Sequence, residues 1–194
     1  MSGKKPITGR TGVFIDFSNL FWQIKMIDPK TSTRTNYDIC FIKLHDLLKT
    51  EHSPIFYNVY ACQDNNAKQE PYLTKAAKHE KFLRFLEGTG YSVLRKDLKH
   101  IGSQAKCDTD VEITMDLHKY ASDIDNIVLF SGDSDFLMAV KYFQSVGKYI
   151  HVYSFKSGLS WELKMFAMQN PRCNFTLLDG LRNKLERVKV THTH

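Results

Sequence analysis

The sequence predicts an α/β protein built as a three-layer α/β/α sandwich with a mainly parallel central sheet. Short apolar runs rich in β-branched and aromatic residues alternate with amphipathic helical segments along the 194 residues. The run Ile127–Phe130 is wholly apolar and is followed at once by a helical pattern, which is typical of a central strand covered on both faces. Strands that alternate with helices are joined by right-handed crossovers and therefore run parallel.

Each element is expected where its hydrophobic period changes. The expected strands are 13–17, 55–61, 91–98, 127–130, 149–153 and 175–178. The expected helices are 20–26, 37–48, 72–86, 108–120, one from about residue 135, 160–168 and a short basic helix near the end. The length fits a single domain over 12–188, preceded by a flexible lead at 1–11 and followed by a polar tail at 189–194.

The order of the strands determines where a ligand would bind. Strand 91–98 alternates apolar and polar residues, which predicts an edge strand that could pair with a second copy in a homodimer. We expect the order 3-2-1-4-5, which makes strands 1 and 4 neighbours where the order reverses. Open α/β sheets bind ligands at that point, beyond the carboxyl ends of the strands.

Composition narrows the class of protein. The chain is 42% hydrophobic and 25% charged, as globular domains are, and no apolar run approaches the roughly 18 residues of a membrane span. The first ten residues are polar and basic, unlike a signal peptide. Four cysteines lie far apart without a C-x-x-C pair, so we expect separate reduced thiols in a cytoplasmic protein and no zinc site. The net charge of +6 suits a polyanionic partner.

Aspartates stand at the ends of three apolar segments. Asp16 closes the first strand, Asp133 and Asp135 follow the fourth, and Asp110 opens the helix between strands 3 and 4. Carboxylates this close repel one another unless a cation lies between them or one of them holds a proton. Hard oxygen ligands with open positions suit Mg²⁺ or Mn²⁺, so these four aspartates are the candidate metal ligands. An ion held there can activate water for the hydrolysis of a phosphodiester.

Other polar residues near these aspartates are candidates for supporting roles. Asn19, one helical turn after Asp16, is placed to orient a carboxylate, a water or a phosphate oxygen through its amide. Asp108 and Asp116 are expected to support the metal ligands without binding the ion themselves. The candidates for contacts with substrate phosphates are Ser131, Ser134, Lys99, His100 and Lys106.

Several of these residues also have a simpler interpretation. Asp133 or Ser134 can cap the following helix, and Asn19 and Asp108 can be ordinary N-caps. Among the aromatic residues, Tyr153 and Trp161 are the better candidates for stacking on bases, although packing in the core is the simpler explanation of both.

Four blocks of the sequence resemble the NYN domains of the LabA-like group, relatives of the PIN nucleases. The blocks are Ile15–Leu20 (IDFSNL), Lys106–Asp116 (KCDTDVEITMD), Ser131–Phe136 (SGDSDF) and Ser160–Ala167 (SWELKMFA), in the order of the family. Lys106 stands one residue further from Asp110 than the lysine of the family does, and Met168 replaces the acid of the last block.

The resemblance implies a PIN-like fold and a metal-dependent ribonuclease whose substrate is RNA, expected to be single-stranded. It implies a catalytic site built from Asp16, Asn19, Asp110, Asp133 and Asp135. An RNA-binding or regulatory module that keeps the acidic pocket without cutting is the alternative.

Two further interpretations are disfavoured by the residues. A phosphatase of the haloacid dehalogenase type needs a second aspartate two residues after the first, where this chain has Ser18. A dinucleotide-binding Rossmann domain needs a G-x-G-x-x-G run after the first strand, which is missing.

Overall fold

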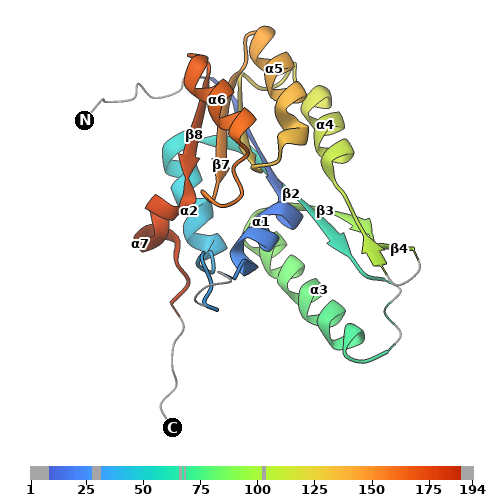
Figure 1. Ribbon diagram of the computed structural model, residues 1–194. Helices are drawn as coiled ribbons and strands as arrows, with labels where there is room; N and C mark the ends of the chain where they lie inside the picture. The colour runs from blue at the N-terminus through green and yellow to red at the C-terminus, as the bar shows by residue number, and fades with distance from the viewer. Residues whose placement is uncertain (1–8, 28–31, 66, 68, 102–103, 189–194) are drawn as a thin grey trace.

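A twisted parallel sheet forms the centre of the protein (Figure 1). The computed structural model describes residues 9–27, 32–65, 67, 69–101 and 104–188, without the side chains of 100, 101 and 104–106. Residues 1–8 of the predicted lead and the predicted tail 189–194 lie outside the described residues. Within the described part, six parallel strands follow the order β3-β2-β1-β6-β7-β8. They are β1 (Thr11–Asp16), β2 (Pro54–Gln63), β3 (Ser92–Asp97), β6 (Asn126–Phe130), β7 (Tyr149–Ser154) and β8 (Cys173–Leu177).

Helices cover both faces of this sheet. They are α1 (Phe17–Lys25), α2 (Phe41–His52), α3 (Tyr72–Gly88), α4 (Asp110–Lys119), α5 (Leu137–Ser145), α6 (Trp161–Gln169) and α7 (Arg182–Leu185), with the 3₁₀ turns η1 (Ser134–Phe136) and η2 (Leu178–Leu181). Side chains of α1, α2, α3 and α7 pack on one face, and side chains of α4, α5 and α6 pack on the other. The predicted α/β/α sandwich and the predicted strand order are therefore confirmed, with β8 added beyond β7.

The strand β1 shows why its sequence lacks an alternating pattern. Successive side chains of a strand point to opposite faces of the sheet. Val13 and Ile15 belong to the core under α1 and α2, whereas Phe14 belongs to the core under α4 and α5, and all three are 0% exposed. Because both faces are covered, both sets of side chains are apolar.

The expected bounds of two helices were wrong. The helix α1 begins at Phe17, three residues early, because Asp16 caps it; Asn19 is therefore not its N-cap. The helix α2 runs from Phe41 to His52, four residues later at each end than predicted. Tyr37 lies outside any helix or strand, and its hydroxyl donates to the backbone oxygen of Leu178 at 2.8 Å. The ring of Tyr37 is buried against residues distant in sequence, and the spacing of neighbouring residues cannot predict such a contact.

The prediction of a basic loop at 99–106 was also wrong. It contains two short antiparallel strands, β4 (Lys99–Ile101) and β5 (Gln104–Lys106). Strands of only three residues are too short to show a hydrophobic alternation, so no strand was predicted there.

The prediction of four separate reduced thiols was wrong as well. A disulfide joins Cys62, at the end of β2, to Cys107, which follows β5, and their Cα atoms are 6.0 Å apart. Cys40 and Cys173 are free. The two bonded residues are separated by 45 positions in sequence, and only the pairing of the folded segments brings them together.

The carboxyl ends of β1 and β6 meet at the centre of the sheet. The two strands are paired in parallel, with Ile15 opposite Phe130, so the residues after both strands emerge at the same edge. Strand β3 is an edge strand, as predicted. Among the described helices, none combines the length and the apolar character that a membrane span requires.

Candidate metal centre

The turn after β6 carries two of the candidate ligands. Asp133 is the N-cap of η1, and its Oδ1 accepts the backbone N–H of Asp135 at 3.1 Å. The capping interpretation is therefore correct for Asp133. One capping bond occupies only part of a carboxylate, which can accept several contacts through its two oxygens, so the cap is compatible with a ligand role. The Asp133 side chain is half-buried and that of Asp135 is exposed.

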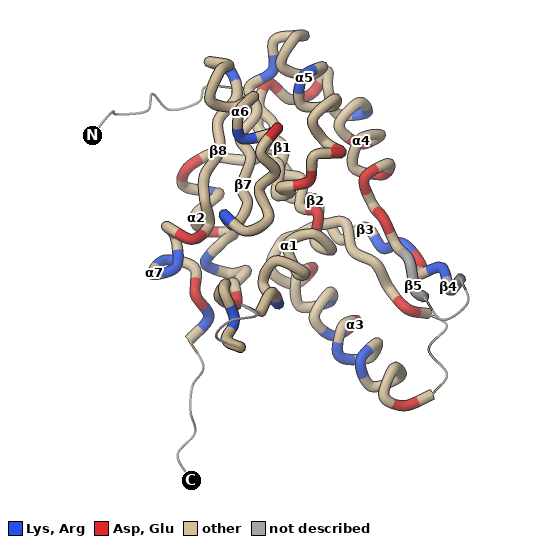
Figure 2. The backbone as a smooth tube through the Cα atoms, viewed as in Figure 1, with Lys and Arg blue, Asp and Glu red and all other residues tan. Residues whose placement is uncertain are grey.

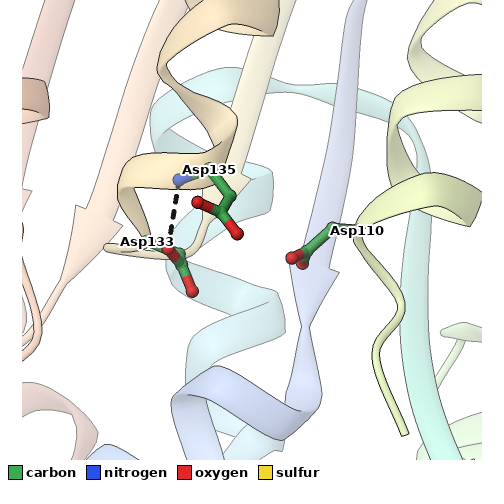
Figure 3. A group of neighbouring side chains, drawn as sticks. All are labelled: Asp110, Asp133 and Asp135. Carbon is green, nitrogen blue, oxygen red and sulfur yellow. Dashed lines mark hydrogen bonds between the residues drawn. The ribbon is translucent and has the colours of Figure 1, made fainter.

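Asp110 approaches the same point from a different helix. It is the first residue of α4, and its backbone N–H donates to Oδ1 of Asp108 at 2.9 Å. Each of Asp110, Asp133 and Asp135 offers a carboxylate oxygen, and these oxygens lie within 4.8 Å of one another (Figure 3). We call these three residues the aspartate triad. Tertiary folding has thus gathered carboxylates from two segments over the end of the sheet.

Asp16 lies beside the aspartate triad, in a more buried position. It is 3% exposed, and its two oxygens accept the backbone N–H of Asn19 at 3.0 Å and the hydroxyl of Ser131 at 3.2 Å. Burial raises the pKa of Asp16 from 3.8 to about 6. The two hydrogen bonds oppose this rise, and the negative charges of Asp133 and Asp108 add to it.

The pKa of Asp110 shows the same crowding of negative charge. It is raised from 3.8 to about 7, first by desolvation and then by the charges of Asp108 and Asp16. Within the described residues, no lysine, arginine or histidine forms an ion pair with Asp16 or with the triad. Arg95 and Lys96, on β3, pair with other acids: Arg95 with Glu80 and Glu87, and Lys96 with Glu112.

This set of donors fits a divalent cation. Several carboxylate oxygens converge without a basic partner, and Mg²⁺ and Mn²⁺ prefer such hard, anionic oxygens. A bound cation would lower the cost of ionising Asp16 and Asp110, whose pKa values are raised by desolvation and neighbouring negative charge.

Sequence reasoning missed Gln23, which fixes the orientation of Asn19. Gln23 is 4% exposed, and its Nε2 donates to Oδ1 of Asn19. The Oε1 of Gln23 accepts the hydroxyl of Ser154 at 3.1 Å and the backbone N–H of Phe155 at 3.0 Å. The same Oδ1 of Asn19 also accepts the backbone N–H of Gly132 at 3.3 Å. Since two donors occupy the amide oxygen, the NH₂ group of Asn19 is left to meet other groups.

A signal for Gln23 was present in the sequence. It stands four residues after Asn19 on the same helix, and residues with that spacing are neighbours on a helix surface. A glutamine whose neighbours along the helix face the core needs buried hydrogen-bond partners.

Gly132 is required by the close approach of two loops. A Cβ atom at this position would lie 2.0 Å from the backbone oxygen of Gly158 and 2.5 Å from Oγ of Ser154. The backbone oxygen of Gly132 accepts the N–H of Ser160, the N-cap of α6, at 2.9 Å. The turn that carries Asp133 is thus pressed against the loop before α6.

The remaining predicted residues occupy different positions. Ser131 is buried and contacts Asp16, whereas Ser134 is exposed. Asp116 accepts the hydroxyl of Tyr60 at 2.7 Å and so ties α4 to β2. Lys99 is exposed on β4. The side chains of His100 and Lys106 lie outside the described residues. Tyr153 is 1% exposed and packs in the core, which excludes base stacking on its ring.

Comparison with known proteins identifies the family. The family model described as "NYN domain" matches residues 10–169 of this chain. The chain belongs to the NYN family. This is a family of PIN-like nucleases, and the aspartate triad of this NYN domain lies inside the matched region.

Two individual proteins are similar to this NYN domain. The low amplitude and bright protein LabA of Synechococcus elongatus is 28% identical over 111 residues, which are 54% of this chain and 57% of LabA. The chain thus matches little more than half the length of that relative. A crystal structure of VPA0982, a protein of unknown function from Vibrio parahaemolyticus, superposes with a TM-score of 0.67 and 24% identity. The superposition covers 94% of this chain and 99% of VPA0982. At this identity the similarity shows the shared fold alone.

Proposed function

We propose that this NYN domain is a metal-dependent ribonuclease that hydrolyses RNA phosphodiester bonds with Mg²⁺ or Mn²⁺ bound at its acidic site. The observation that carries the proposal is the aspartate triad, whose carboxylate oxygens lie within 4.8 Å of one another with the buried Asp16 beside them. The cation would be held by Asp110, Asp133 and Asp135, with Asp16 as a further ligand. When bound, it would supply activation of water and neutralisation of charge on the phosphate.

The residues of the chain would position the reacting groups. Ser131 holds the Asp16 carboxylate through its hydroxyl, and its oxygen accepts the N–H of Asp133 at 3.3 Å. Asn19, with its amide oxygen fixed by Gln23 and Gly132, would direct its NH₂ group toward a phosphate or water oxygen. Such fixed donors stabilise developing negative charge without rearranging during the reaction.

Basic residues outside the acidic site would attract and bind the RNA. The net charge of +6 would favour the approach of a polyanion, and the exposed Lys99 on β4 would contact a phosphate of the RNA outside the acidic site.

A cleavage assay tests this function. A fluorophore-labelled single-stranded RNA is incubated with the protein in Mn²⁺, in Mg²⁺ and in EDTA, and we expect cleavage only with a metal. Asp133→Asn should reduce the rate by at least a hundredfold, since it removes a charged ligand. The matched control is Asp123→Asn, an exposed aspartate outside the site whose side chain accepts the hydroxyl of Ser122.

The outcomes separate an enzyme from a binding module. Cleavage that survives Asp133→Asn indicates a contaminating nuclease and removes the support for the proposal. Binding of RNA without cleavage in either metal would instead favour the non-catalytic module.

A further inference from the structure

The helix α1, which begins at the acidic site, carries an exposed tryptophan. Trp22 lies three residues after Asn19 on α1, and residues with this spacing are neighbours on a helix surface. Trp22 is 74% exposed. A large ring left in solvent one helical turn from the site contributes little to folding, because most of its apolar area remains in water. Its ring is therefore available for an external contact.

Positive charges gather around Lys25, the neighbour of this tryptophan on α1. Lys25 lies one turn further along α1, with its Nζ 3.8 Å from the centre of the Phe21 ring. The pKa of Lys25 is lowered by partial burial and then by the positive charges of Arg34 and Lys75. Arg34 pairs with Asp38, whereas Lys25 and Lys75 form no ion pair within the described part of the chain.

The helix α3 continues this basic surface. Phe82 of α3 packs on Phe17, the first residue of α1, with ring centres 5.5 Å apart, so the two helices lie side by side. Lys78 precedes Phe82 by one turn and is exposed, which places it on the flank of α3 nearest α1. Figure 2 shows basic positions spaced along α3, while acidic positions lie at the start of α4. We call Trp22, Lys25, Lys75 and Lys78 the α1–α3 surface.

Trp161, the other tryptophan, has a different electrostatic setting. It is 69% exposed and begins α6, where Glu162 follows it directly and Lys164 lies one turn on. Acid and base are thus mixed next to Trp161, whereas the charged residue one turn from Trp22 on its helix is Lys25. The two rings are equally available to solvent, and only one of them lies on a surface complementary to a polyanion.

We propose that the α1–α3 surface binds the single-stranded RNA substrate beside the acidic site, with a base stacked on Trp22 and phosphates at Lys25, Lys75 and Lys78. The inference rests on the proposed function, because it concerns the substrate of the same site. An unpaired base can place its face on an exposed ring, whereas a base inside a duplex is already covered on both sides. Stacking together with rows of cations is the usual way in which proteins hold single strands without reading their sequence.

Fluorescence provides a direct test, because the chain has two tryptophans. Trp161→Phe leaves Trp22 as the reporter, and Trp22→Phe leaves Trp161. Each variant is titrated in EDTA, to prevent cleavage, with an oligouridylate of about ten nucleotides, within the site sizes of single-strand binders. The same titration is run with a duplex of oligouridylate and oligoadenylate.

We expect saturable quenching of Trp22 by the single strand, with little change of Trp161 and little effect of the duplex. Trp22→Ala should weaken binding roughly tenfold or more, and the matched control Trp161→Ala should change it less than about twofold. Lys75→Gln combined with Lys78→Gln should reduce the slope of log affinity against log salt by about 1.4, because each phosphate contact to a single strand contributes about 0.7.

The result can be separated from that of the cleavage assay. Quenching of Trp22 without cleavage in metal would overturn the nuclease but support this surface. Cleavage combined with an unquenched Trp22, with equal quenching of both tryptophans, or with equal quenching by the duplex would overturn the surface and leave the nuclease intact.

Discussion

Replacing Asp16 by asparagine should make the metal-free protein more stable at neutral pH. The carboxylate of Asp16 is 3% exposed and has no basic partner among the described residues. Its hydrogen bonds come from the N–H of Asn19 and the hydroxyl of Ser131. An asparagine can keep both contacts, by accepting from Asn19 and donating to the oxygen of Ser131, so Asp16→Asn removes the charge and keeps the shape.

The size of the effect follows from the pKa of Asp16. Its value in the folded protein, about 6, exceeds the ordinary 3.8, so folding favours the protonated carboxyl. The resulting stabilisation is complete below about pH 4 and is lost as the pH rises through about 6. The rise in pKa from 3.8 to about 6 corresponds to a change of about 3 kcal/mol in the free energy of unfolding, at about 1.4 kcal/mol for each pKa unit.

Chemical denaturation from pH 4 to pH 7.5 in EDTA measures this quantity. We expect the free energies of unfolding of the wild type and Asp16→Asn to differ little at pH 4. The variant should become more stable by up to about 3 kcal/mol at pH 7. Millimolar Mn²⁺ should reduce the difference in the free energy of unfolding between the two proteins at pH 7, because it binds and stabilises the wild type. A difference that stays constant across this pH range would refute the reasoning, since it would mean that the buried carboxylate does not titrate as argued.

Three further predictions concern the support of the site and the disulfide. Gln23→Glu keeps the acceptor for the neighbouring loop but loses the donor to Asn19, so kcat should fall about tenfold or more with KM nearly unchanged in steady-state assays. Gly132→Ala should lower the free energy of unfolding by about 3 kcal/mol and abolish activity, because the loop it faces leaves no room for a Cβ. Reduction of the bond between Cys62 and Cys107 should lower stability by about 4 kcal/mol, from the entropy of a loop closed over 45 residues.

Each of these predictions has an outcome that contradicts it. Unchanged kcat in Gln23→Glu would show that Asn19 does not act through this contact. A fully stable and active Gly132→Ala would mean that the two loops separate easily. For the disulfide, equal denaturation midpoints with and without reductant would count against a contribution of the bond to stability.

Local patterns in the sequence were sufficient to predict the sheet and to name the aspartates of the candidate metal centre. The apolar run of β6 and the aspartates that follow it predicted both a central strand and an acidic turn, because strand period and turn chemistry are properties of neighbouring residues. The placement of Asp16 beside that turn followed from the rules of parallel α/β topology.

What the sequence alone did not provide depends on contacts between distant segments. The hydrogen bonds of Gln23 to the loop after β7, the fit of Gly132 against Gly158, and the bond between Cys62 and Cys107 each join residues far apart in the chain. No hydrophobic period or short motif encodes such a pairing, since it exists only after the sheet has formed. The sequence thus determined which side chains could bind a metal, and the tertiary structure decided how closely they meet and what holds them there.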